Sequence, residues 1–133
     1  MTTRDICFTP AIELAAMIHG GEVSSLEVVR AVLDRIERLN PQINAYCTVV
    51  AERALVEARA ADAALADGAE TGPLHGVPVS IKDLVATKGI RTTQGSPLLK
   101  NWVPDFDAPL VERLRSAGAV ILGKTNTPEF GHL

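Results

Sequence analysis

A lysine closes a short apolar run that has the composition of a buried β-strand. The run extends from Gly76 through Val79 and Ile81 to Lys82, and Asp83 follows directly. Burial lowers the pKa of an amine because the charged form is poorly solvated in apolar surroundings. An amine that acts as a general base near neutral pH needs a pKa of roughly 7–8. The position of Lys82 therefore predicts a candidate base, provided that its surroundings are dry.

Alternation along this strand decides which side chains share a face with the amine. Val77, Val79 and Ile81 should point to one face, and Ser80 and Lys82 to the other. Three β-branched residues on one face favour packing of that face against helices. The ordinary alternative is that the lysine reaches solvent or pairs with the aspartate that follows it, and then it has no catalytic role.

The elements that must position this lysine begin with two helices. Thr9-Pro10 predicts the start of the first helix, and Gly20-Gly21 predicts its end. The second helix should begin at the capping box from Ser24 to Glu27. It should end at Asn40-Pro41, because proline disfavours helical backbone at the residue before it.

The next segment predicts one more helix before the sheet. The alanine-rich stretch from Ala51 to Ala66 favours a helix, and Gly68 is placed to close it. The short segment from Asn44 to Val50 is ambiguous between strand and loop.

After residue 70 the pattern changes to that of a sheet. Thr87 to Pro97 is rich in Gly, Thr and Ser, which predicts an irregular, partly exposed excursion. Asp107 is a plausible cap for a helix that ends at Gly118, and Ala119 to Leu122 predicts a buried strand that Gly123 breaks. The order strand, helix, strand predicts a crossover between two parallel strands.

This crossover would bring two lysine-bearing segments to one edge of the sheet. In sheets of parallel strands, ligands bind outside the carboxyl ends of the strands. Lys82 and the segment Lys124-Thr125-Asn126 both follow strand-like runs. We therefore expect them to lie at the same edge, with Lys124 either solvated or bracing a loop.

One motif at this edge matches a phosphate-binding pattern by its letters alone. Gly118 to Thr125 satisfies GxxxxGK[ST]. That pattern works when its intervening residues form a loop and a helix begins at the lysine. Here the intervening residues are the most strand-like run nearby, and Pro128 follows closely. A nucleotide-binding loop is therefore a minor alternative.

The remaining polar residues give weaker indications. His19, His75 and His132 are far apart and show no metal-ligand spacing, so we expect no metal site. Ser96 lies in a Gly-Ser-Pro turn, not in the strained elbow of a nucleophilic serine. Glu129 is more easily explained as a solvated or structural carboxylate than as an acid or base.

Composition narrows the class of protein. A chain of 133 residues suits one domain, and a net charge of −3 gives no electrostatic reason to expect a nucleic-acid partner. Cys7 and Cys47 lack the spacing of a redox or metal motif, which suggests reduced thiols in the cytoplasm. The sequence shows neither a signal peptide nor an apolar run of the ~20 residues that a spanning helix needs. We therefore expect a soluble, cytoplasmic chain without a membrane partner.

Two segments resemble those of the amidase signature enzymes, whose catalytic set is a lysine, a serine in a cis peptide bond and a nucleophilic serine. Gly72 to Asp83 looks like the lysine segment of that family, and Gly118 to Gly131 looks like the segment that follows it. The helical region is similar as well, at Ser24 to Val29 and at Arg35 to Glu37. The segments occur in the family's order and spacing, and the similarity spans essentially the whole chain.

The resemblance implies hydrolysis of a carboxamide to a carboxylate and ammonia or an amine through a serine acyl-enzyme. Lys82 matches the family's lysine, and a neutral Lys82 would accept a proton from the bridging serine. Phe130 and Gly131 match the segment that lines the acyl pocket. The supporting positions near the site would be Ser80, Asp83, Thr92, Ser96, Thr125 and Asn126.

The resemblance also implies an α/β fold, in which N-terminal helices precede the first strands of a mixed sheet covered by helices on both faces. Residues 1–133 would form the N-terminal part of a single amidase domain, with a helical region at 1–70 and the start of the sheet core, including Lys82, at 71–133. The family's glycine- and serine-rich segment should follow Gly131, but it is absent from these residues. We therefore expect an incomplete amidase that is inactive alone.

Several alternatives remain open within and beyond this family. One member is the glutamine-hydrolysing subunit of a tRNA-dependent amidotransferase, although Thr127 to Gly131 looks slightly more like the general amidases. A different class is a non-catalytic interaction module that kept the helices and lost the chemistry. The expected partner is a small-molecule amide substrate, no cofactor is implied, and a homo-oligomer is neither required nor excluded.

Overall fold

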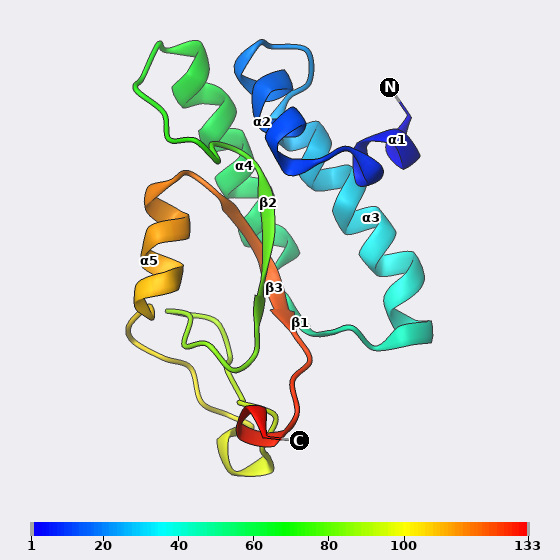
Figure 1. Cartoon of the computed structure of the whole chain (residues 1–133), viewed down its shortest axis with the longest axis vertical. Coiled ribbons are helices and arrows are strands. Elements are labelled where there is room, and N and C mark those ends of the chain that lie inside the picture. Colours follow the sequence, from blue (N-terminus) through cyan, green and yellow to red (C-terminus); the bar gives the residue numbers. More distant parts are fainter. Residues whose placement is uncertain (1, 133) are drawn as a thin grey trace.

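The computed structural model describes residues 2–132, which form a three-stranded sheet with helices on both faces (Figure 1). The helices and strands are, in chain order, α1 (Thr3–Phe8), α2 (Ala11–His19), α3 (Ser25–Ile43), β1 (Tyr46–Val49), α4 (Ala51–Ala66), β2 (Pro78–Lys82), α5 (Pro109–Ser116) and β3 (Val120–Thr125). Two single-turn 3₁₀ helices, η1 (Pro97–Leu99) and η2 (Glu129–Gly131), lie in the segments after β2 and β3.

The sheet is mixed, as the sequence predicts. Its strand order is β1-β3-β2, so the last strand in sequence lies in the centre. β2 and β3 run parallel, which confirms the predicted crossover through α5, whereas β1 and β3 run antiparallel. The ambiguous segment after α3 is therefore a strand, and the sheet also draws on the first 70 residues.

Alternation along β3 explains how both faces of the sheet are covered. Val120 and Leu122 pack against Val29 of α3 and Ala58 of α4 on one face. On the other face, Ile121 packs with Ile81 of β2, with Val111 of α5 and with Ile90 of the excursion after β2, and together these form a second core cluster. The buried apolar side chains alternate between the two clusters because successive residues of a strand point to opposite faces.

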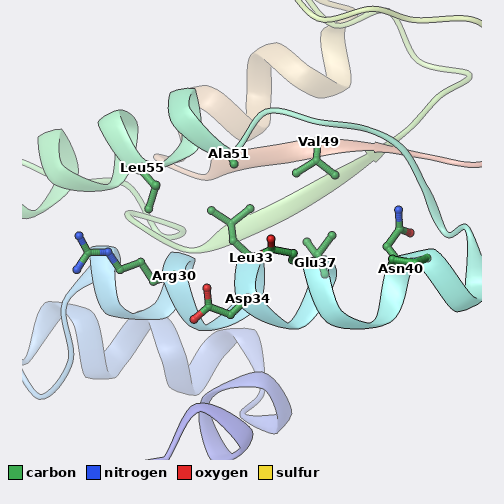
Figure 2. Close-up of a pocket in the computed structure, with 10 residues that line it drawn as sticks. Arg30, Leu33, Asp34, Glu37, Asn40, Val49, Ala51 and Leu55 are labelled. Carbon is green, nitrogen blue, oxygen red and sulfur yellow. The ribbon is translucent and has the colours of Figure 1, made fainter.

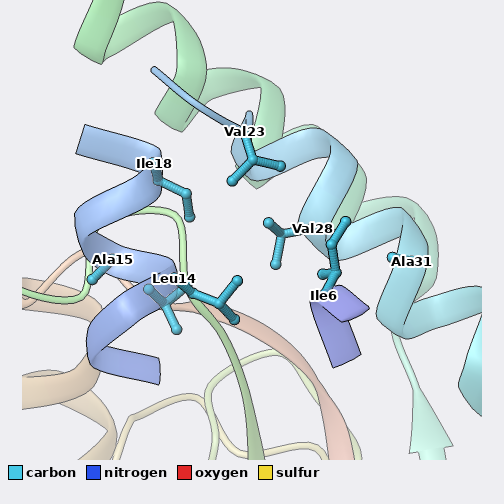
Figure 3. Close-up of a cluster of buried hydrophobic side chains, with 8 residues drawn as sticks. Ile6, Leu14, Ala15, Ile18, Val23, Val28 and Ala31 are labelled. Atoms are coloured by element: carbon cyan, nitrogen blue, oxygen red, sulfur yellow. The ribbon is translucent and has the colours of Figure 1, made fainter. Parts of the chain in front are cut away.

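A third cluster holds the N-terminal helices together. Leu14 and Ile18 of α2 meet Val28 of α3 and Ile6 of α1, and Val23 closes the cluster from the turn before α3 (Figure 3). Val77, just before β2, belongs to the same cluster and ties the helices to the sheet. None of the helices within residues 2–132 is both long enough and apolar enough to cross a membrane.

The second helix begins as predicted but continues past its predicted end. Ser24 and Glu27 form the capping box, each side chain accepting a hydrogen bond from the other residue's backbone. Pro41 lies inside the helix, which ends only at Asn44 in a left-handed conformation with φ of 49°. Asn40 bonds both backbone groups of Tyr46, at 2.8 and 3.1 Å, and so closes the turn into β1. The prediction that Asn40-Pro41 ends the helix is wrong.

Two predictions in the second half also fail at their boundaries. Asp107 does not cap α5, because its carboxylate accepts bonds from the Lys88 backbone at 2.7 Å and the Arg115 guanidinium at 2.8 Å. Gly123 does not break the strand, because β3 continues to Thr125. A side chain at position 123 would place its Cβ 2.1 Å from the Thr48 carbonyl oxygen, so the glycine allows β1 to approach β3.

This close approach makes Gly123 a sensitive position. We expect Gly123→Ala to lower the free energy of unfolding by about 1–3 kcal/mol, because the strand must move to admit the methyl group. Thermal unfolding of the complete gene product that contains these residues, called here the parent polypeptide, measures the effect.

Gly20→Ala is the matched control for this substitution. Gly20 has φ of −76°, and its nearest neighbour would lie 3.3 Å from an added Cβ. We expect a change within about 0.5 kcal/mol for this variant. Equal stability of the two variants would contradict the role given to Gly123.

Candidate catalytic edge of the sheet

Lys82 lies at the carboxyl end of β2, opposite Thr125 at the end of β3. The two segments that the sequence predicts to share an edge therefore do so. The Lys82 side chain is exposed, on the same face of the strand as the exposed Ser80. Its amine has no hydrogen-bond or ion-pair partner within residues 2–132. These residues do not by themselves provide the dry surroundings that a base at this position requires.

A bulge in the register decides which lysine is buried. Val79 pairs with Ile121, but Ser80 pairs with Gly123, so β3 carries one extra residue at this point. Beyond the bulge, Lys124 lies opposite Ile81 and turns to the face that Ile81 occupies. A strict alternation would have placed Lys124 on the face of Leu122.

Lys124 is the buried lysine of this edge, with a side chain that is 0% exposed. Its Nζ donates to the carbonyl oxygen of Val85 at 2.8 Å and to the hydroxyl of Thr92 at 2.7 Å. The Asp83 carboxylate lies 3.6 Å from the same nitrogen. Burial lowers the pKa of the Lys124 amine, and the Asp83 charge opposes that change. Of the two predicted alternatives, Lys124 braces a loop and is not solvated.

Asp83 is held from several sides and is only 1% exposed. Its carboxylate accepts bonds from the backbone amide of Thr93 at 3.2 Å and from the Thr93 hydroxyl. Its backbone amide donates to Thr125 at 2.8 Å, and its carbonyl accepts from Gln94 at 2.9 Å. The expected ordinary pairing of Lys82 with Asp83 is therefore wrong, because Asp83 pairs with Lys124.

The groups of β1 that face this edge carry no charge of their own at neutral pH. Burial, followed by the nearby Asp83 charge, raises the pKa of the Cys47 thiol. Burial also raises the pKa of the Tyr46 phenol, and the Ser80 hydroxyl partly opposes this effect. The Cys47 thiol donates to the carbonyl oxygen of Lys124 at 3.4 Å.

The remaining predicted residues fall into two separate places. The Ser96 hydroxyl donates to Glu129 at 2.7 Å, and the backbone amide of Phe130 donates to Gln94 at 2.7 Å, so the excursion after β2 is tied to η2. Gly131 packs so closely on Leu84 that a Cβ there would lie 2.9 Å from its methyl group. Asn126 lies apart, with its amide bonded to Asn44 between α3 and β1.

The partners in this network were only partly predicted from the sequence. Thr92 and Asp83 were expected near the site, but Thr93 was not, and Lys124 was expected only as a strand-end residue. Lys124 ends an apolar run that is as strand-like as the run before Lys82, so the same reasoning would have marked it as buried. Glu129 has the structural role expected of it, since it accepts the bond from Ser96.

Two other possibilities meet direct geometric tests. The GxxxxGK[ST] pattern is not a phosphate loop here, because Val120–Thr125 is a strand and the lysine amine is engaged with Thr92 and Asp83. Within residues 2–132, no cluster of three or more His, Cys, Asp or Glu side chains is arranged to hold a metal ion.

A pocket elsewhere on the surface is separate from the predicted site. It has a volume of about 560 Å³ and lies between α3 and the β1–α4 connection, where Leu33, Val49 and Leu55 face one another (Figure 2). Neither Lys82 nor any predicted supporting residue lines it.

Comparison with known proteins places the chain in a family. The amidase family model matches residues 27–133. The chain is 52% identical, over 95% of its length, to a glutamyl-tRNA(Gln) amidotransferase subunit of Acidothermus cellulolyticus, of which it covers 25%. It is 53% identical to the corresponding subunit from a Geobacter species, over 89% of the chain and 24% of that subunit.

Solved structures agree with this assignment. The native peptide amidase from Stenotrophomonas maltophilia matches with a TM-score of 0.86 at 40% identity, over 92% of this chain and 26% of that enzyme. A fatty acid amide hydrolase matches with a TM-score of 0.89 at 29% identity, over 96% of this chain and 23% of that enzyme. The chain thus spans about a quarter of the length of the relatives that it matches. It belongs to the amidase signature family, as its sequence segments indicated.

Proposed function

We propose that this chain carries the amine base of an amide hydrolase that works through a serine acyl-enzyme. The observation that carries the proposal is the position of Lys82 at the carboxyl end of β2, beside the end of β3, in a chain of the amidase signature family. Ligands of sheets with parallel strands bind at this edge. The neutral amine would take a proton from a bridging serine, which in turn would deprotonate the nucleophile.

The two serines of this mechanism would come from polypeptide outside these 133 residues. Residues 1–133 would then be the N-terminal part of one amidase domain, in keeping with the quarter of the relatives' length that they cover. The added polypeptide would also exclude water from Lys82, which is exposed here. Backbone amides of the same segment would stabilise the oxyanion of the tetrahedral intermediate. Phe130 and Gly131 would border the acyl pocket.

A second candidate has a specific observation in its favour. Identities of 47–53% to glutamyl-tRNA(Gln) amidotransferase subunits exceed the 40% identity to the peptide amidase. This whole-chain comparison weighs more than the five residues from Thr127 to Gly131 that look like the general amidases. The parent polypeptide would then release ammonia from glutamine for a tRNA-dependent amidotransferase. Ammonia release from L-glutamine, compared with release from a peptide C-terminal amide, distinguishes the two candidates.

The central test of the proposal is replacement of the base. We expect Lys82→Met in the parent polypeptide to lower kcat for amide hydrolysis by about 10²–10⁴-fold, because the nucleophile loses its proton acceptor. Lys100→Met is the matched control, since Lys100 is an exposed lysine away from the sheet edge, and its activity should remain that of the wild type. Wild-type activity of the Lys82 variant would favour a non-catalytic interaction module.

The isolated 133-residue chain provides an independent test. We expect it to release no ammonia from L-glutamine or from a peptide C-terminal amide, because it holds the base without the serines. Reaction with a fluorophosphonate, followed by mass spectrometry of the intact chain, should likewise leave its mass unchanged. Formation of a covalent adduct at a serine of this chain would contradict the proposed division of the catalytic set.

A further inference from the structure

A buried carboxylate directly follows the proposed base. Asp83 is the next residue after Lys82, and its backbone amide and carbonyl are both bonded, to Thr125 and to Gln94. These two bonds fix the strand end from which the Lys82 side chain extends. The same residue also brings a negative charge close to an amine that must stay unprotonated to work.

That charge is a liability for the chemistry unless something cancels it. A carboxylate near an amine favours the ammonium form, because opposite charges attract. An ammonium group cannot accept a proton from a serine. The Lys124 amine lies 3.6 Å from the Asp83 carboxylate, on the buried face of the sheet, and makes the pair neutral as a whole.

Stability alone does not explain a charged pair at this position. Desolvation of two buried charges is costly, and replacement of such a pair by apolar residues of similar volume is often neutral or stabilising. The surroundings of Lys124 are otherwise a core of Ile81, Ile90, Val111 and Ile121, in which a leucine or methionine would be an ordinary occupant. The retained charges therefore point to a role at the neighbouring Lys82.

We propose that Asp83 and Lys124 form a neutral positioning unit for Lys82, in which Asp83 fixes the strand end and Lys124 prevents its carboxylate from drawing a proton onto the Lys82 amine. This inference rests on the proposed function of Lys82 as the base. It assigns Lys124 a part in the reaction without contact with the substrate.

Few other charges act at this edge. β1 contributes the Tyr46 phenol and the Cys47 thiol, whose raised pKa values keep both neutral. The excursion after β2 contributes Arg91, whose guanidinium donates to the carbonyl of Lys100, and the uncharged hydroxyls of Thr92 and Thr93. Removal of one partner of the Asp83–Lys124 pair should therefore leave a net local charge of known sign.

The test is the pH dependence of serine labelling by a fluorophosphonate in the parent polypeptide, which needs no knowledge of the substrate. The labelling rate should fall at low pH as the Lys82 amine becomes protonated. Lys124→Met leaves the carboxylate uncancelled and should move this fall upward by about one pH unit. Asp83→Asn leaves the ammonium uncancelled and should move it downward by a similar amount. The double variant should return to the wild-type profile.

Opposite shifts of the two single variants separate this role from a purely structural one, which would lower the rate without moving the profile in two directions. Asp107→Asn is the matched control, because it disrupts the Asp107–Arg115 ion pair at α5 and should leave the profile in place. If circular dichroism shows that Lys124→Met does not fold, the direction of the Asp83→Asn shift decides.

The outcomes also separate this inference from the proposed function. Shifts of both single variants in the same direction, or unmoved profiles, would overturn the neutral positioning unit. Absence of labelling in the wild type, or an unchanged profile in Lys82→Met, would instead overturn the role of Lys82 as the base and the inference with it.

Discussion

The buried contact between Lys124 and Asp83 holds the catalytic edge of the sheet together. It joins the end of β3 to the end of β2, and through Thr92 and Thr93 it fixes the irregular excursion that follows β2. A buried charge without a partner would destabilise the fold by several kcal/mol, so these four residues must assemble together. The exposed Lys82 takes its position from this assembly, since Asp83 is its neighbour in the chain.

Much of the framework around this contact could be predicted from local patterns. The capping box at Ser24, the alanine-rich α4 and the parallel pairing of β2 with β3 all follow from short-range signals that the fold does not override. The boundaries at Pro41 and Gly123 could not be predicted in the same way. Bonds from Asn40 to Tyr46 and the approach of Thr48 decide them, and both depend on where β1 lies.

The candidate site was predicted only in part, for a related reason. A lysine after an apolar run is either buried or exposed, and the sequence holds two such lysines, Lys82 and Lys124. The one-residue bulge in β3 turns Lys124 into the core, whereas Lys82 stays on the open face of an edge strand. No local pattern reveals this bulge, because it arises from pairing between strands that lie far apart in sequence. The resemblance to the amidase signature family located the functional lysine where burial alone could not.

A structure of the parent polypeptide trapped as its fluorophosphonate adduct would decide whether Lys82 is placed to act as the base. The measured quantity is the distance from the Lys82 Nζ to the nearest serine oxygen supplied by the rest of the polypeptide. We expect a separation of about 3 Å, within reach of proton transfer, with water excluded from the amine. A Lys82 amine that points into bulk solvent, away from every serine of the site, would rule this role out.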